Sequence, residues 1–282
     1  MTNLLEAIQN IVHSPISDLV SHYKGKNRIN GVGDALEFFV KDAFAGTINA
    51  GGESERLVKY SEVFSYAGNQ NNPPDLMIRG GDAVEVKKIE SYGSQIALNS
   101  SYPKAKLFAD DPMITSTCRN CETWTEKDII YAIGIASNQR LNLLWLVYGD
   151  CYAAEKEIYE KTRNRLINGI ADTQGVDFTV TKELGRVNKV DPLGITYLRI
   201  RGMWGIENPA KAFSYVDTGY APSANFQMIA LMKESKYASF SKESRENIEK
   251  IVLPGFSMRD VVIKAPSNPV EVLPAKVINY TR

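Results

Sequence analysis

The apolar residues in the first part of the chain change their spacing from one segment to the next, and each spacing predicts an element. Between residues 4 and 23 they recur near a period of 3.6, which predicts helix, and Pro15 divides this segment into two short helices. Residues 35–44 repeat the helical spacing, with Asp34 as the expected N-cap. Residues 60–66, YSEVFSY, alternate between polar and apolar positions and therefore predict a strand.

Two segments in the middle of the chain are apolar almost without interruption. They cover residues 124–135 and 141–148, and strands covered on both faces of a sheet carry such continuous apolar runs. Residues 153–170 have a charged amphipathic pattern that predicts a helix. Together these elements favour an α/β (α+β) fold in which helices flank a central mixed β-sheet.

The last third of the chain combines polar stretches with short predicted elements. A polar linker begins at residues 184–186, and residues 195–201 predict a strand. Residues 241–250 predict a short polar helix, and residues 266–282, with three prolines, predict an extended or edge segment. We expect the whole chain to form a single domain.

Residues 73–89, PPDLMIRGGDAVEVKKI, predict two strands joined by a glycine-containing turn. If residues 80–82 form a three-residue loop, Asp75 opposes Lys87, and Glu85 points to the same side of the hairpin. A two-residue loop would shift the register and turn Asp75 away. The alternative interpretation is a surface hairpin with solvated charges.

Two carboxylates and a lysine on one sheet face can form a site for a hard cation. Mg²⁺ prefers oxygen ligands, so we expect Asp75 and Glu85 to hold it, with the carbonyl of Val86 as a third ligand. Lys87 would orient or deprotonate the attacking water and stabilise the transition state. Glu37 is either an outer carboxylate of this site or a residue that interacts with its helix dipole.

The loop at residues 98–104 is polar and rich in turn-forming residues. We expect Asn99, Ser101 and Lys104 to contact phosphates or base edges. The alternative is a solvated loop.

The segment after residue 195 carries a second set of candidate DNA contacts. Arg199 and Arg201 alternate on one face of the predicted strand, and Asn208 follows in a loop. Arginine suits guanine or phosphate, and asparagine suits adenine edges or the DNA backbone. Salt bridges or simple solvation are the alternatives for the arginines.

Composition limits the classes of function. Lys and Arg total 33, as do Asp and Glu, so the formal net charge is zero. This balance argues against a generally basic protein that coats nucleic acid, but it permits a local basic cleft. The chain has no apolar run approaching a membrane span and no signal-peptide pattern, so we expect a cytoplasmic protein without a membrane partner.

Cys118 and Cys121 form a Cys-x-x-Cys pair that suggests zinc or redox chemistry. Zinc would need two further ligands, and the available residues, Cys151, His13 and His22, are distant in the sequence. Two ordinary thiols in a loop are the favoured interpretation.

Pro74-Asp75 followed by Glu85-Val86-Lys87 resembles the motif of the PD-(D/E)xK nuclease superfamily. The rest of the chain resembles type II restriction endonucleases of the NgoPII-like family. The segments that carry this resemblance are GVGDALEFFVKDAF, LNSSYPKAKL, WTEKDIIYAIG, WLVYGDCYAA and LRIRGMWGIENP. The resemblance implies a restriction-endonuclease-like core, with a catalytic part at about residues 31–150 and DNA-recognition elements at about residues 184–282.

The resemblance also implies a Mg²⁺-dependent homodimer that cuts both strands of a short palindromic duplex, with GGCC as the target described for the family. A cognate DNA methyltransferase would belong to the same system. Asp75, Glu85 and Lys87 match the motif directly, whereas Glu37 corresponds only by its position on the preceding helix. Two alternatives stay open: a structure-specific or repair nuclease of the same fold, and a catalytically silent DNA-binding module.

Overall fold

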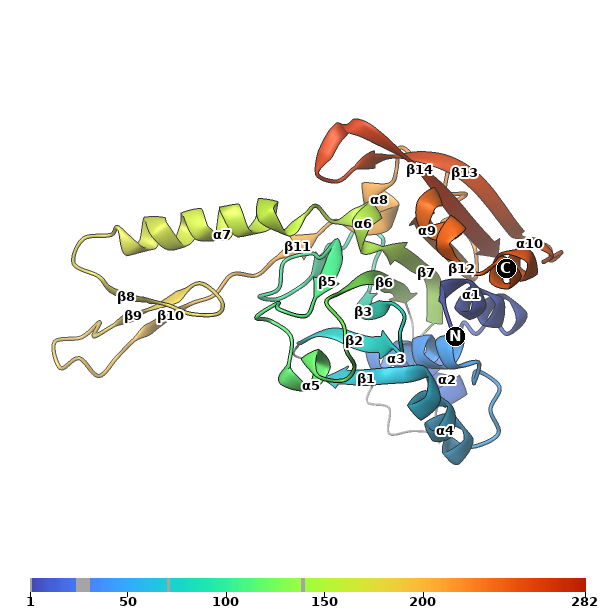
Figure 1. Ribbon diagram of the computed structural model, residues 1–282, viewed down its shortest axis with the longest axis horizontal. Coiled ribbons are helices and arrows are strands. Elements are labelled where there is room, and N and C mark those ends of the chain that lie inside the picture. Colours follow the sequence, from blue (N-terminus) through green and yellow to red (C-terminus); the bar gives the residue numbers. More distant parts are fainter. Residues whose placement is uncertain (1, 24–30, 70–71, 138–139) are drawn as a thin grey trace.

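One mixed sheet crosses the protein (Figure 1). The computed structural model describes residues 2–23, 31–69, 72–137 and 140–282, and nine strands within these ranges belong to the sheet. In spatial order they are β1 (Phe64–Asn69), β2 (Asn72–Ile78), β3 (Ala83–Ile89), β6 (Glu126–Ser137), β7 (Arg140–Tyr148), β12 (Gln227–Lys233), β14 (Asn268–Thr281) and β13 (Phe256–Ala265), with β5 (Lys106–Phe108) pairing to β6. The β3–β6 and β7–β12 pairs are parallel and the others are antiparallel.

The centre of the sheet consists of the two strands with continuous apolar runs. β6 and β7 are buried along most of their lengths, and Trp145 on β7 is fully buried. The prediction of two central strands is therefore confirmed. β12, QMIALMK, is buried in the same way, although it is a strand that we do not predict from the sequence.

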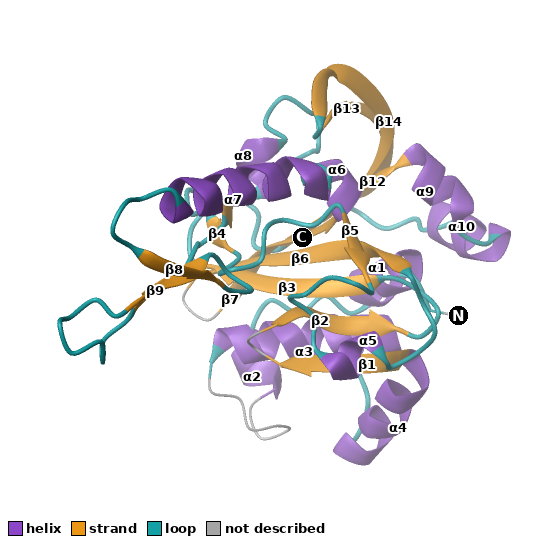
Figure 2. Cartoon of the chain, turned by 60° about the vertical axis from the view of Figure 1, so that its left-hand side comes forward, coloured by secondary structure: helices purple, strands orange, loops and turns teal. Residues whose placement is uncertain are grey.

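Helices from the N-terminal part of the chain cover the sheet. Among the described residues, eight helices lie outside the arm and its return: α1 (Leu4–His13), α2 (Leu19–Tyr23), α3 (Val32–Ala45), α4 (Glu53–Val63), α5 (Ser116–Arg119), α6 (Gly149–Tyr152), α9 (Glu234–Ser239) and α10 (Lys242–Glu249). α1 and α2 pack on α3, which contacts β3 and β6 and lies below these two strands in the view of Figure 2. Within the described ranges, no helix has the length and apolar composition needed to cross a membrane.

Two helix boundaries differ from the predictions. α3 begins at Val32 with Gly31 as its N-cap, so Asp34 is not the N-cap. Asp34 lies in the first turn, where its negative charge interacts favourably with the helix dipole. The predicted strand at residues 60–66 is wrong in its first half, because α4 continues to Val63. Tyr60 uses helical spacing to reach α3, where its hydroxyl donates to the buried Asp42 at 2.7 Å.

A long arm leaves the body after β7 and returns to it before β12 (Figure 1). It consists of α7 (Lys156–Ala171) and a three-stranded sheet of β8 (Asp177–Val180), β9 (Gly185–Asn188) and β10 (Leu198–Ile200). The return is made by β11 (Gly205–Ile206), which pairs with β4 (Ile96–Ala97), and by α8 (Pro209–Ala212). α7 confirms the helix predicted at residues 153–170. β9 lies where a polar linker was expected, and β10 is shorter than the strand predicted from residue 195.

The C-terminal region completes the main sheet. α10 begins after Ser241, whose side chain caps it, which confirms the predicted polar helix. β14 confirms the extended segment, but it lies between β12 and β13 and is therefore no edge strand. The expected division between a core and C-terminal elements is not a boundary of the sheet, because β12, β13 and β14 continue it beyond β7.

Candidate active site

The hairpin of β2 and β3 has the expected side-chain parity but a different pairing. Met77 pairs with Ala83, so an odd number of residues separates the two partners. Asp75 and Glu85 therefore point to the same side of the sheet. Continuing this register places Asp75 across from Glu85, so the expected pairing of Asp75 with Lys87 is wrong by two residues.

The turn is centred one residue earlier than expected. The amide of Ile78 donates to the carbonyl of Asp82 at 2.9 Å, and the amide of Gly81 donates to the carbonyl of Ile78 at 2.9 Å. Gly80 has a φ of 65°, in the left-handed region that glycine adopts without strain. Asp82 thus belongs to the hydrogen-bonded end of the hairpin rather than to its loop, and this accounts for the shift.

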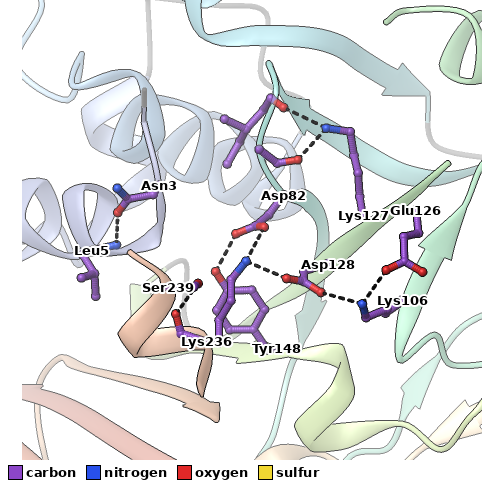
Figure 3. A network of polar contacts seen from close by, with 12 residues as sticks. Asn3, Leu5, Asp82, Lys106, Glu126, Lys127, Asp128, Tyr148, Lys236 and Ser239 are labelled. Atoms are coloured by element: carbon purple, nitrogen blue, oxygen red, sulfur yellow. Dashed lines mark hydrogen bonds and ion pairs between the residues drawn. The ribbon is translucent and has the colours of Figure 1, made fainter. Parts of the chain in front are cut away.

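Figure 3 shows how Asp82 is held in this position. Its carboxylate accepts hydrogen bonds from the hydroxyl of Tyr148 at 2.6 Å and from Nζ of Lys236 at 2.8 Å. The same ammonium group donates to Asp128 at 2.7 Å, and Lys127 donates to a carbonyl of the turn at 2.6 Å. Groups from β6, β7 and α9 therefore anchor the turn that joins the two site strands.

Asp75, Glu85 and Lys87 converge on one cavity of about 220 Å³. Nζ of Lys87 lies 2.5 Å from Oε1 of Glu85, and the amide of Val86 donates to Oδ2 of Asp75 at 2.7 Å. Tyr131 also lines the cavity, since it is the partner of Glu85 in the parallel β3–β6 ladder. The sequence carries no signal for Tyr131, because this pairing joins residues that are distant along the chain.

The charges in this cavity act strongly on one another. Burial and the neighbouring charge of Glu85 raise the pKa of Asp75 from 3.8 to about 7. Burial alone would lower the pKa of Lys87, but attraction to Glu85 and Asp75 raises it above its usual value of 10.5. Oε2 of Glu85 is buried and has no hydrogen-bond partner among the described residues. The site therefore holds more carboxylate oxygen than its ammonium group satisfies.

A hard divalent cation fits this set of donors. Mg²⁺ takes oxygen ligands and usually only one or two carboxylates, with water and phosphate in its remaining positions. Asp75 and Glu85 provide two carboxylates on one cavity wall. In the part of the chain that the structure describes, no three Asp, Glu, His or Cys side chains are grouped for metal binding. Further ligands would therefore come from the backbone, from water or from DNA.

Glu37 lies on α3 and contributes to the electrostatics of the site. Its charge adds to the effects that raise the pKa of Asp75. Its carboxylate forms an ion pair with Lys41 at 2.7 Å and is about one-third exposed. The described residues that line the cavity do not include it, so its position suits an outer role rather than direct contact.

The polar loop at residues 98–104, which follows β4, contributes Asn99, Ser101 and Lys104 to the cavity lining. Asn99 has a left-handed backbone with a φ of 53°, and Oγ of Ser101 is buried without a hydrogen-bond partner in the described ranges. The ammonium group of Lys104, by contrast, is buried, forms an ion pair with Asp111 and lies 4.2 Å from the centre of the Tyr102 ring. Asn99 and Ser101 face the cavity as candidate contacts, whereas Lys104 is already engaged within the protein.

The two arginines of the arm converge on one carboxylate. Nη2 of Arg199 lies 3.2 Å and Nε of Arg201 lies 3.1 Å from Oε2 of Glu183. Both arginine side chains remain more than half exposed, while Glu183 is largely buried and lines the same cavity as Asp75 and Glu85. The sequence gives no signal for Glu183, because it is a single acidic residue in a polar stretch.

Asn208 has a structural role in the protein. It is fully buried, its Oδ1 accepts from the amide of Lys211 at 3.2 Å, and its Nδ2 donates to the carbonyls of Tyr92 and Ser94 at 2.7 and 3.0 Å. The side chain caps α8 and is not accessible to base edges, so we no longer assign it a DNA contact. The Asn208-Pro209 pair, an N-cap followed by proline, is a helix-start signal that the sequence does contain.

The cysteines of the Cys-x-x-Cys pair are free thiols that pack against residues of β1 and β2. Sγ of Cys118 lies 3.3 Å from Sδ of Met77, and Sγ of Cys121 lies 3.7 Å from Oγ of Ser65. Burial raises the pKa of Cys118 to about 12, so this thiol stays protonated at neutral pH. These contacts, with Met77 on β2 and Ser65 on β1, are packing contacts.

Comparisons with known proteins agree over nearly the whole chain. The family model described as NgoPII restriction endonuclease matches residues 2–264. The type II restriction enzyme NgoPII of Neisseria gonorrhoeae is 46% identical over 280 residues, which cover 99% of this chain and 99% of that protein. No solved structure matches the chain significantly.

Proposed function

The chain belongs to the NgoPII restriction endonuclease family, and from this premise we propose that the cavity around Asp75, Glu85 and Lys87 is its catalytic centre. The protein is a type II restriction endonuclease, which hydrolyses phosphodiester bonds at specific sites in DNA. One observation carries the proposal: the three residues of the PD-(D/E)xK pattern lie in the same cavity, although nine residues separate the two halves of the pattern.

We propose that Asp75 and Glu85, with the carbonyl of Val86, hold Mg²⁺. Their excess carboxylate oxygen and the raised pKa of Asp75 support this assignment. When bound, Mg²⁺ lowers the pKa of a coordinated water and neutralises charge on the scissile phosphate. Glu37 tunes the charge of this site from outside the cavity.

Lys87 acts on the phosphate and on the attacking water. Its raised pKa keeps the ammonium group protonated at neutral pH, which favours the role of a donor over that of a general base. Glu85 holds the ammonium group at 2.5 Å and so fixes its direction before DNA arrives. A preformed donor of this kind stabilises the charge that develops in the transition state.

DNA contacts come from two regions beside the cavity. Asn99 and Ser101 line it next to the carboxylates and would contact the phosphates that flank the cleaved bond. Arg199 and Arg201 are exposed on the arm, and their planar groups suit guanine edges or phosphates. Lys104 supports the loop through its pair with Asp111 instead of contacting DNA directly.

The substrate we propose is a short palindromic duplex, bound by a homodimer and cut in both strands. A two-fold protein matches a two-fold site. The family resemblance suggests GGCC, and a cognate DNA methyltransferase would protect the host genome. These assignments are supported by the relationship to NgoPII over the full chain.

Digestion of a sequenced plasmid tests the proposal directly. With Mg²⁺ the purified protein should give discrete fragments whose mapped ends share one short sequence, and EDTA should stop the reaction. Asp75→Asn should leave the plasmid intact. Cutting restricted to branched or nicked DNA would favour a repair nuclease, and binding without cleavage in Mg²⁺ or Mn²⁺ would favour a silent DNA-binding module.

A further inference from the structure

Glu183 connects the arm to the catalytic cavity through its side chain. It belongs to the turn between β8 and β9 and is one of the residues that line the cavity. This turn lies at the end of the small sheet nearer the body, at the root of the arm (Figure 1). Oε1 accepts a hydrogen bond from Oγ of Ser100 at 2.9 Å. Ser100 belongs to the polar loop at residues 98–104, which we call the site loop. Oε2 contacts Arg199 and Arg201 at 3.2 and 3.1 Å. One carboxylate thus joins two exposed arginines to the site loop.

The backbone of this segment is held in place from α7. Nε of Arg163 donates to the carbonyl of Glu183 at 2.8 Å, and its Nη2 donates to the carbonyls of Thr181 and Lys182 at 3.0 and 3.2 Å. Arginine makes several directed hydrogen bonds with one planar group, so three successive carbonyls are fixed at once. The direction of the Glu183 side chain is therefore set before DNA binds.

The root of the arm also packs directly on the site loop. The rings of Tyr102 and Tyr159 stack with centroids 5.3 Å apart, and the ring of Trp204 meets both edge-on. The amide of Trp204 donates to the carbonyl of Asn99 at 2.7 Å, and the amide of Leu98 donates to the carbonyl of Trp204 at 2.8 Å. A displacement at the root of the arm would consequently reach the residues that line the cavity.

We propose that Glu183 is a positioning residue that couples DNA contact by Arg199 and Arg201 to the geometry of the catalytic cavity. The inference rests on the proposed function, because it requires that the arm arginines bind DNA. In the free protein, one carboxylate holds both guanidinium groups and the hydroxyl of Ser100. When phosphates or base edges take the arginines, the carboxylate loses its charged partners but keeps Ser100, and the site loop shifts with it. Correct contacts on the arm thereby set the position of the loop beside the cleaved bond.

The experiment compares two substitutions on the same arm. Glu183→Gln removes the charge but keeps an oxygen that can accept from Ser100. Asp177→Asn is the control, because Asp177 is exposed and pairs with Lys189 at 3.8 Å, away from the cavity lining. For each full-length protein, single-turnover cleavage in Mg²⁺ is measured at saturating DNA on the mapped site and on duplexes with one base pair changed. The temperature of unfolding is measured in parallel.

We expect Glu183→Gln to reduce the ratio of cleavage rates between the correct and altered sites roughly tenfold, within the range that one base contact supplies. Binding to unrelated DNA should be as tight or tighter, since the arginines keep their charge. The Asp177→Asn ratio should stay within about twofold of wild type, as expected for an exposed pair. Glu183→Asp, which retains the charge, should restore most of the discrimination.

Three results would overturn the inference: an unchanged ratio in Glu183→Gln, an equal loss in Asp177→Asn, or an equal loss on all duplexes with a lowered unfolding temperature. The last would make Glu183 a purely structural residue. These results are separate from a failure of the proposed function, which would appear as cleavage by Asp75→Asn or as no cleavage by the wild type.

Discussion

Asp75, Glu85 and Lys87 lie together in the cavity that we propose as the catalytic centre, and the charge of Glu85 acts on the ionisation of the other two. Asp75 is the group most affected, since burial and Glu85 both disfavour its charged form. Lys87 is affected in the opposite sense, because the same negative charges favour its protonated form. The metal-free site is therefore short of positive charge, which prepares it for a cation and for a phosphate held beside it.

Replacing Lys87 by alanine should lower cleavage by roughly 10² to 10³ or more, because it removes a preformed donor to the developing charge. Duplex binding should remain measurable, since other groups contact the DNA backbone. Plasmid cleavage and gel-shift assays measure the two effects. Lys88→Ala is a matched control, because Lys88 pairs with Glu90 outside the cavity. This variant should cut normally. Normal cleavage by Lys87→Ala would contradict the role assigned to Lys87.

The raised pKa of Asp75 predicts how the metal-free protein responds to pH. Because the folded pKa of about 7 lies above the unfolded value of 3.8, folding favours the protonated form. The stability from this group is full below the unfolded value, falls as pH rises, and is lost once pH passes the folded value. In EDTA, the melting temperature of the wild type should therefore fall relative to Asp75→Asn between about pH 4 and about pH 7, then level off. Parallel curves for the two proteins would contradict the shift.

The β2–β3 hairpin illustrates which features a single sequence can and cannot predict. Side chains alternate along a strand, so the shared face of Asp75 and Glu85 follows from local spacing once the loop is odd in length. The pairing itself could not be predicted, because it depends on Asp82 being held by Tyr148 and Lys236. Both partners lie far along the chain, and their position depends on the completed sheet.

The same reasoning applies to the candidate DNA contacts. Residue type alone suggested Lys104 and Asn208, but each is engaged by a partner inside the protein. Arg199 and Arg201 stay exposed, yet their common partner Glu183 carries no local pattern. Chemistry identifies residues that are able to bind DNA, and only the tertiary arrangement decides which of them are accessible.

The anchor of the hairpin turn can be tested by removing Lys236. Lys236→Ala leaves Asp82 and Asp128 without their shared ammonium group in a largely buried setting. Loss of one partner from such a pair should cost about 3 kcal/mol of unfolding free energy, measured by urea denaturation. Lys242→Ala is the control, since Lys242 is 84% exposed and pairs with Glu246 at the surface, and it should change stability by less than about 0.5 kcal/mol. Equal stability of the two variants would show that the network does not anchor the turn.

At the scale of the whole molecule, the cavity that we propose as the catalytic centre lies between the sheet and the root of the arm. The cavity is lined by residues of β2, β3 and β6, by the polar loop at residues 98–104, and by Glu183. The sheet supplies rigid support for the carboxylates, while the arm extends from the body with the two arginines. One chain thus carries one such cavity in its described part, and a double-strand cut requires two cleavage events.

A mixed dimer tests whether each chain cleaves one strand. Wild-type and Lys87→Ala chains with different affinity tags are co-expressed, and the mixed dimer is purified through both tags. If each cavity cuts one strand, this dimer should convert supercoiled plasmid to the open-circular form and accumulate it, because the second strand lacks a competent cavity. A mixed dimer with Lys88→Ala should give linear DNA at the wild-type rate. Linear product from the Lys87→Ala mixed dimer at the wild-type rate would mean that one cavity cuts both strands. If no doubly tagged species is recovered, the proposed homodimer is wrong.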